Sequence, residues 1–154
     1  MKRVVVTGIG IVSCIGNTIK DVTDSLYNAK SGITFSEEYK NLGFKSHVYG
    51  KPEINLEEKI DRRILRFMGE GAAYNYVSLD DAIKDSGLEE KDISNEKTGI
   101  IVGSGGPSVK NLLLATDIAR EKGSRKVGPY MVPRTMSSTN SATLSTPLKI
   151  KGVN

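Results

Sequence analysis

The apolar residues of this chain occur partly in short β-branched runs and partly at helical spacing. Residues 4–6 are three valines followed by Thr7-Gly8, and residues 98–102 lead into Gly103. Runs of this kind, bounded by glycine, predict two buried strands. Because helical segments separate them, the alternation favours an α/β layer fold.

Helical spacing is clearest in two places. A first helix, capped by Asn17 or Thr18 and ended by Ser31-Gly32, would bury a face made of Ile19, Val22, Leu26 and Ala29. A second ends at Ser86-Gly87, a typical C-terminal stop, and its apolar positions are Ala72, Tyr76, Leu79 and Ile83.

The remaining segments are less regular. Residues 108–120 predict a helix with Leu112, Leu113 and Ala119 facing inward, and residues 135–146 predict one rich in small side chains. Residues 33–60 are expected to form a surface excursion with a short helix or hairpin, and residues 88–96 an acidic turn.

Composition narrows the class of protein. The chain has 154 residues, of which 38% are hydrophobic and 26% charged, typical of one globular domain with a core. The net charge of +4 suits an acidic protein partner but does not identify nucleic acid. A single cysteine excludes a disulfide framework and fits a reducing compartment, so we expect a cytoplasmic protein. No apolar run approaches the roughly 20 residues of a membrane span.

The N-terminus allows a second interpretation. Residues 1–3 are basic, residues 4–12 are mostly apolar, and residues 11–14 resemble a lipoprotein cleavage site before Cys14. Thr7, Gly8 and Gly10 interrupt the apolar stretch, however, which favours a strand running into a glycine turn.

Two glycine-rich segments resemble nucleotide-binding motifs. Residues 7–10 suggest a dinucleotide fingerprint, but Ser13 stands where a third glycine belongs, and no tyrosine has lysine four residues later. A nicotinamide-dependent oxidoreductase is therefore a weaker alternative to a turn that needs glycine for steric reasons. Residues 103–106 lack the Gly-Lys-Ser/Thr of a phosphate loop, so a crowded turn is the simpler interpretation.

The remaining candidate functional residues are nucleophilic or basic. Cys14 could be a nucleophile, but it lies in an apolar turn and nothing in the sequence indicates that it meets His47, the single histidine. One histidine and one cysteine are too few ligands for a zinc site. The basic residues form two groups, either solvated surface or a docking face for an acidic protein or phosphate: Arg62, Arg63 and Arg66, then Lys122, Arg125 and Lys126. No aromatic residues interleave with them as on a nucleic-acid surface.

Several segments together resemble the β-ketoacyl-acyl-carrier-protein synthase family, a group of thiolase-like condensing enzymes. The matching segments, in family order, are residues 4–17, 31–33, 61–63 with 66–68, 103–106 and 127–130. The resemblance covers the whole chain, residues 1–154. Residues 31–36, 46–48 and 127–130 are closer to the synthase I type than to synthase II.

The resemblance implies a thiolase-like αβαβα layered fold with two similar halves, built as a homodimer. This chain would supply most of the first half. It also implies decarboxylative Claisen condensation in fatty acid biosynthesis, in which a cysteine takes an acyl group from acyl carrier protein. Two histidines then assist the reaction with malonyl-carrier protein. No metal or cofactor is implied.

The family places its nucleophilic cysteine just after a Gly-Val-Asn step, where residues 152–154 stand. We therefore expect no catalytic residue in this chain and no condensation by it alone. The positions of Gly106 and Met136 match acyl-pocket positions, Met136 reaching the neighbouring subunit. The six basic residues match the carrier-protein docking face. A non-catalytic carrier-protein-binding module is the main alternative.

Overall fold

The computed structural model describes residues 3–154 as two compact units. Of the described residues, the first unit consists of 3–55 with 78–86, and the second of 56–77 with 87–154. One helix, α5 (Glu70–Ser86), therefore contributes to both units. Met1 and Lys2, which belong to the basic start of the lipoprotein interpretation, lie outside the described residues.

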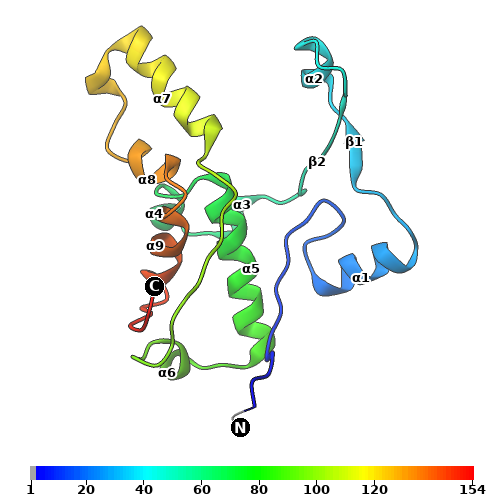
Figure 1. Cartoon of the computed structure of the whole chain (residues 1–154), viewed down its shortest axis with the longest axis vertical. Coiled ribbons are helices and arrows are strands. Elements are labelled where there is room, and N and C mark those ends of the chain that lie inside the picture. Colours follow the sequence, from blue (N-terminus) through cyan, green and yellow to red (C-terminus); the bar gives the residue numbers. More distant parts are fainter. Residues whose placement is uncertain (1–2) are drawn as a thin grey trace. The chain divides into compact units, whose positions relative to one another are not determined.

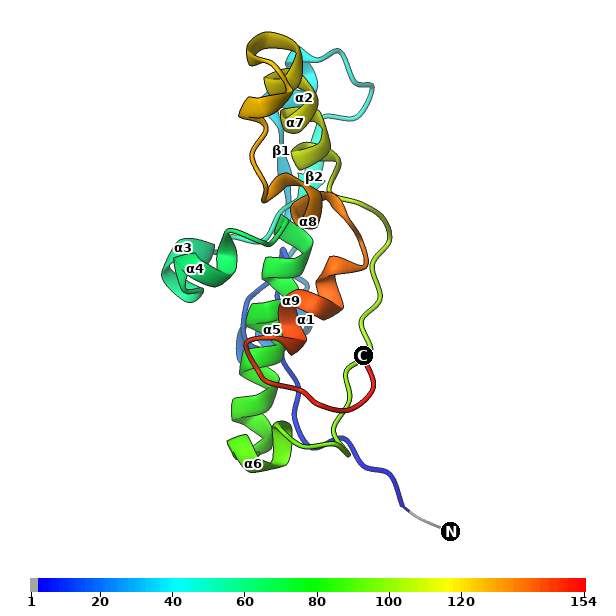
Figure 2. The same cartoon turned by 90° about the vertical axis from the view of Figure 1, so that its left-hand side faces the viewer.

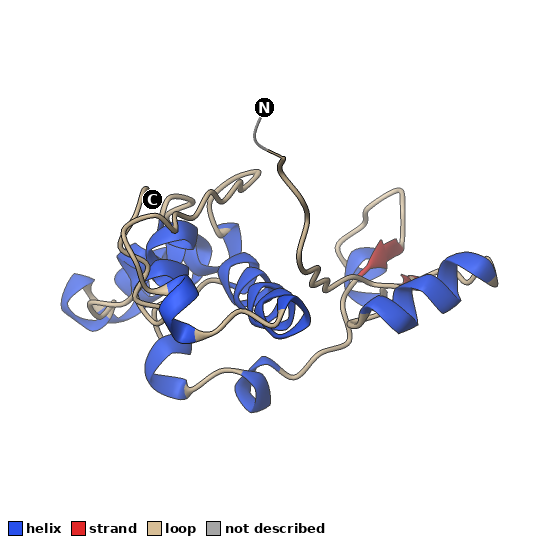
Figure 3. Cartoon of the chain, turned by 90° about the horizontal axis from the view of Figure 1, so that it is seen from below, coloured by secondary structure: helices blue, strands red, loops and turns tan. Residues whose placement is uncertain are grey.

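The first unit contains helix α1 (Ile19–Tyr27), strand β1 (Ile33–Phe35), helix α2 (Glu37–Asn41) and strand β2 (Val48–Gly50). The two strands are antiparallel, with Ile33 opposite Gly50 and Phe35 opposite Val48. Figure 3 shows no other strand in the described chain. The predicted hairpin or short helix within residues 33–60 is confirmed, and both are present.

Thr18 caps α1, as one of the two predicted residues, and its hydroxyl accepts a hydrogen bond from the Asp21 amide at 3.1 Å. The helix ends at Tyr27, before the predicted Ser31-Gly32. Its predicted buried face is wrong, because Ile19 and Leu26 are exposed and Ser25 is the buried residue. The Ser25 hydroxyl donates to the Ile15 carbonyl at 2.7 Å.

The second unit holds the apolar core. Among the described residues, every buried hydrophobic side chain belongs to it, and these are Ile60, Met68, Ala72, Ala73, Val77, Ile93 and Leu144. Its helices besides the first half of α5 are α3 (Leu56–Lys59), α4 (Arg62–Leu65), α6 (Glu90–Ile93), α7 (Val109–Lys122), α8 (Met131–Thr135) and α9 (Thr139–Ser145). A 3₁₀ turn, η1 (Ser124–Lys126), follows α7. Figure 2 shows the chain returning from α7 through α8 to α9.

Helix predictions with local end signals agree best with the structure. Helix α5 ends at Ser86, and Gly87 has the left-handed φ of 67° that glycine adopts readily. The predicted helix over residues 108–120 exists as α7, but its orientation was wrong: Leu112 and Leu113 are exposed while Asn111 is buried. The small-residue helix begins at Thr139, four residues later than predicted. The acidic segment 88–96 includes a short helix, α6.

Neither predicted buried strand forms. Val4 is 96% exposed and Ile101 is 98% exposed, and neither run belongs to a strand. Strand pairing needs a neighbouring strand to accept its backbone hydrogen bonds, and residues 4–6 have none among the described residues. Residues 98–100 have only part of such a neighbour: the Ile100 amide donates to the Val153 carbonyl, and the Gly152 amide to Thr98. No helix in the described part of the chain is long and apolar enough to cross a membrane.

Candidate functional site

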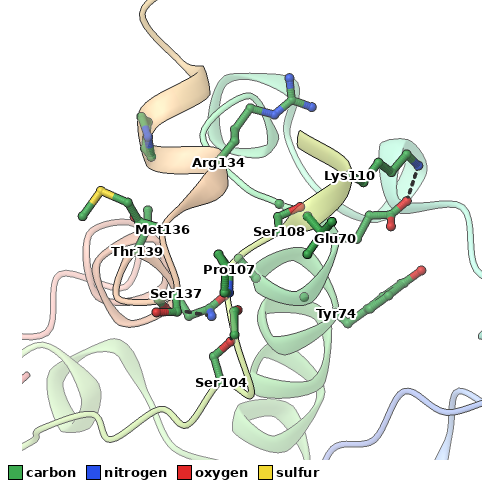
Figure 4. Close-up of a pocket in the computed structure, with 17 residues that line it drawn as sticks. Glu70, Tyr74, Ser104, Pro107, Ser108, Lys110, Arg134, Met136, Ser137 and Thr139 are labelled. Carbon is green, nitrogen blue, oxygen red and sulfur yellow. Dashed lines mark hydrogen bonds and ion pairs between the residues drawn. The ribbon is translucent and has the colours of Figure 1, made fainter. Parts of the chain in front are cut away.

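A cavity of about 450 Å³ lies in the second unit, where the start of α5, the loop 104–110 and residues 133–140 meet (Figure 4). Gly106 and Met136, the two predicted pocket residues, both line it. They lie 30 positions apart in the sequence, so the fold is what brings them together. Met136 follows α8 in an extended conformation and is half exposed.

Close backbone contacts hold the walls of the cavity. A Cβ on Gly69 would lie 2.8 Å from the Arg134 carbonyl oxygen and 3.1 Å from the Ser108 side chain, so glycine is what allows this approach. The Ser108 amide donates to the Thr135 carbonyl at 3.1 Å. These contacts hold the turn before α5, the start of α7 and the end of α8 close together.

The glycine loop 103–106 is open rather than crowded. A Cβ on Gly103, Gly105 or Gly106 would meet no atom within 4 Å. The crowded-turn interpretation of this loop is therefore wrong in the described structure. Gly106 lines the cavity and has open space at its Cβ position, so we expect a larger side chain here to reduce the cavity volume.

An ion pair and a tyrosine lie on the side of the cavity formed by α5. The Lys110 ammonium contacts the Glu70 carboxylate at 2.7 Å, and Tyr74 lies one turn further along α5 (Figure 4). Burial raises the pKa of Tyr74, the Glu70 charge raises it further, and Lys110 lowers it. The phenol is therefore neutral at physiological pH and presents a hydroxyl rather than a charge.

The basic residues form two groups in the second unit, one at α4 and one at the end of α7 and in η1. Arg62 and Arg63 open α4, whose N-cap Asp61 accepts a hydrogen bond from the Arg63 amide at 2.7 Å. Arg66 follows α4, and its guanidinium carbon lies 5.1 Å from the ring centroids of both Phe67 and Tyr130. The second group stands at the end of α7 and in η1, and consists of Lys122, Arg125 and Lys126. All six predicted docking residues are exposed.

The steric interpretation of the first glycine motif is supported. A Cβ on Gly8 would lie 2.2 Å from the Ala82 carbonyl oxygen, and one on Gly10 would lie 1.8 Å from that of Ser78. These glycines therefore allow the N-terminal segment to pass against the second half of α5, within the first unit.

Cys14 and His47 show no catalytic arrangement. His47 packs edge-on against Phe35, with ring centroids 6.0 Å apart. A Cβ on Gly50 would lie 2.9 Å from the Cys14 sulfur, so the thiol is packed against the hairpin. In the described part of the chain, no group of three or more metal-ligating side chains comes together.

One polar residue at this site escaped sequence analysis. Arg134 lines the cavity and also a neighbouring hollow beside α4, and its Nε is buried without a hydrogen-bond partner among the described residues. It is isolated from other basic residues in the sequence, so no local pattern indicates its proximity to Arg62 and Arg66. A conserved pattern across homologues could have pointed to it.

Comparison with known proteins gives a consistent result. The family model described as Beta-ketoacyl synthase, N-terminal domain, matches residues 1–154. The chain is 47% identical to 3-oxoacyl-[acyl-carrier-protein] synthase 1 of Haemophilus influenzae and 46% identical to that of Escherichia coli. Both matches cover 100% of this chain but 38% of the relative. A synthase 2 from Staphylococcus aureus is 30% identical, which agrees with the predicted synthase I likeness.

Solved structures agree at the level of the fold. The ishigamide ketosynthase/chain length factor superposes with a TM-score of 0.84 at 22% identity, covering 97% of this chain and 38% of that one. A β-ketoacyl synthase from Burkholderia phymatum gives 0.83 at 22% identity, covering 99% and 38%. The predicted partial thiolase-like α/β fold is therefore confirmed, although its strands are mostly unformed here. The chain belongs to the β-ketoacyl synthase family and corresponds to that family's N-terminal domain.

Proposed function

We propose that this chain is the N-terminal, substrate-shaping and carrier-docking part of a 3-oxoacyl-[acyl-carrier-protein] synthase of fatty acid biosynthesis. The full-chain match to synthase 1 relatives carries this proposal, and the chain spans about 38% of their length. The reaction of the whole enzyme would be decarboxylative Claisen condensation between an acyl thioester and malonyl-carrier protein. Its predicted cytoplasmic location is supported by the single, unpaired cysteine.

Condensation by this chain alone is not expected. The reaction implied by the family needs one nucleophilic cysteine and two histidines, whereas the sequence has one histidine in total. That histidine packs against Phe35, and Cys14 packs against the hairpin. We expect the purified chain, supplied with acyl- and malonyl-carrier protein, to form no carbon–carbon bond by product mass spectrometry. Any β-ketoacyl product at enzymatic rate would contradict this assignment.

Carrier-protein docking is the activity that the chain can be tested for directly. The six exposed basic side chains would attract an acidic carrier protein, and a type II polyketide ketosynthase of similar fold, with a TM-score of 0.75, has been solved in complex with its acyl-carrier protein. Charge steering weakens as the Debye length shrinks from about 30 Å at 0.01 M salt to about 3 Å at 1 M.

We therefore expect affinity for holo acyl carrier protein to fall about tenfold or more over this range of ionic strength. Fluorescence anisotropy of labelled carrier protein at several salt concentrations measures it. Binding that does not change with salt would favour the solvated-surface interpretation of the two basic groups. Binding without acyl transfer would be the signature of the non-catalytic module that the sequence leaves open.

A homodimer also forms part of the proposal. An apolar groove of about 530 Å³ runs along one side of the second unit, lined by Arg63, Ile64, Phe67, Pro133, Thr139, Ala142, Thr143, Thr146 and Pro147. Small α9 side chains on its wall allow a second backbone to approach closely. Met136 precedes this helix, so a second copy seated here would lie near the cavity that Met136 lines.

A further inference from the structure

A hollow of about 590 Å³ beside α4 collects three arginines from two separate elements. Arg62 and Arg66 come from α4 and the residue after it, and Arg134 comes from α8. Ile60 and Leu65 provide an apolar lining, and Glu57 is the one carboxylate on the wall. The hollow lies entirely in the second unit.

Contacts within the folded chain hold Arg66 in position before any ligand arrives. Its guanidinium carbon lies 5.1 Å from the centroid of each of the Phe67 and Tyr130 rings, which contact each other edge-on. The Arg134 amide donates to the Tyr130 carbonyl at 3.2 Å. Tyr130 therefore contacts the Arg66 side chain through its ring and the Arg134 backbone through its carbonyl. Because the ring contacts already hold the Arg66 guanidinium, this group loses less entropy on binding.

The guanidinium groups lack an anionic partner. Across residues 3–154, no ion pair to a carboxylate is formed by Arg62, Arg66 or Arg134. The Nε of Arg134 is buried and has no hydrogen-bond acceptor among residues 3–154. A buried donor without an acceptor is rare in folded proteins, and it marks the Arg134 side chain as incompletely paired. Figure 4 shows the Arg134 guanidinium projecting away from Ser104 and Ser137.

We propose that Arg134 completes, with Arg62 and Arg66, a receptor for one carboxylate side chain of the acidic carrier protein. This inference rests on the docking role proposed above and adds to it a residue from outside the two basic groups. Planar guanidinium groups bind carboxylates through paired hydrogen bonds. Two of the predicted docking residues, Arg62 and Arg66, line the hollow, and the side-chain anions of an acidic protein are carboxylates.

The arrangement also separates Arg63 from its neighbours. Arg63 lines the apolar groove, whereas Arg62 and Arg66 line the hollow. Adjacent arginines in the sequence therefore have different surroundings. Arg63 contributes long-range attraction, and the three residues of the hollow contribute a localised contact.

The test compares variants of the full chain for binding to holo acyl carrier protein by fluorescence anisotropy. Arg134→Gln is expected to weaken binding about tenfold, the loss typical of a charge-assisted hydrogen-bonded contact. Arg134→Lys keeps the positive charge but not the planar pair of N–H donors, so it should recover part of the lost affinity. Arg120→Gln removes one charge from an exposed α7 position outside the hollow and should change affinity less than about twofold.

Each outcome bears on a different claim. Equal losses for Arg134→Gln and Arg120→Gln would overturn the receptor but leave docking intact, whereas no binding by the native chain would reject docking itself. The circular dichroism spectra of Arg134→Lys and Arg134→Gln must match that of the native chain, which shows that both variants are folded. If folded Arg134→Lys binds carrier protein no better than Arg134→Gln, the receptor is also overturned. If inorganic phosphate displaces carrier protein more strongly than chloride does at equal ionic strength, the hollow is a phosphate site, and the proposed carboxylate ligand is wrong.

Discussion

Replacing Gly10 with alanine is expected to lower the free energy of unfolding of the chain by about 3 kcal/mol or more, the upper range for overpacking a filled site. The new Cβ would lie 1.8 Å from the Ser78 carbonyl oxygen and 2.8 Å from the Ala82 amide nitrogen. Both atoms belong to the backbone of α5, which cannot rotate away as a side chain would. The N-terminal segment must therefore leave the helix.

Urea unfolding followed by far-ultraviolet circular dichroism measures this effect. Gly71→Ala, at the other end of α5, is the matched control, because a Cβ there meets no atom within 4 Å. It should raise stability by about 0.5–1 kcal/mol, since alanine is the better helix former. A Gly10→Ala midpoint equal to that of the native chain would show that the N-terminal segment does not pack against α5.

Gly106→Ile, made in a longer version that carries the catalytic residues, is expected to reduce activity on long acyl chains about 10- to 100-fold while sparing short ones. The isoleucine would project into the cavity that Gly106 lines with Met136. A few methylene groups that no longer fit lose roughly 1–3 kcal/mol of transition-state binding. Competition between acyl-carrier proteins of different chain length, read as kcat/KM ratios, measures the change.

Gly105→Ile provides a close control for this substitution. Its Cβ also meets no atom within 4 Å, but Gly105 does not line the cavity. Both variants have the same composition and the same altered loop, so they differ in whether the substituted position lines the cavity. An unchanged chain-length preference in Gly106→Ile, or an equal change in Gly105→Ile, would argue against the acyl-pocket assignment.

Local signals were the reliable part of the sequence. The Thr18 cap and the Ser86-Gly87 stop were predicted because each acts within one helical turn of its position. The valine run 4–6 has equally strong local preference, yet it forms no strand, because pairing requires a partner elsewhere. The leucines of α7 were assigned the wrong side for a related reason: spacing defines a face but does not say which element will cover it.

The candidate site likewise contains residues that the sequence could suggest and one that it could not. Gly106 and Met136 could be proposed as pocket residues because the family resemblance assigns each position separately, and both line one cavity in the fold. Arg134 could not be identified, because its significance comes from proximity to Arg62 and Arg66. No sequence interval within the chain encodes that proximity. A binding surface formed by elements that are distant in the sequence becomes apparent only in the folded structure.

The unpaired valines of residues 4–6 also bear on how such a chain is made. Helices α1, α5 and α7 are closed by hydrogen bonds four residues apart, so they can form soon after they leave the ribosome. The valines of residues 4–6 are exposed and belong to no strand among the described residues. An exposed β-branched apolar run of this kind favours association with other chains. We expect chaperones that bind exposed apolar segments to bind this one.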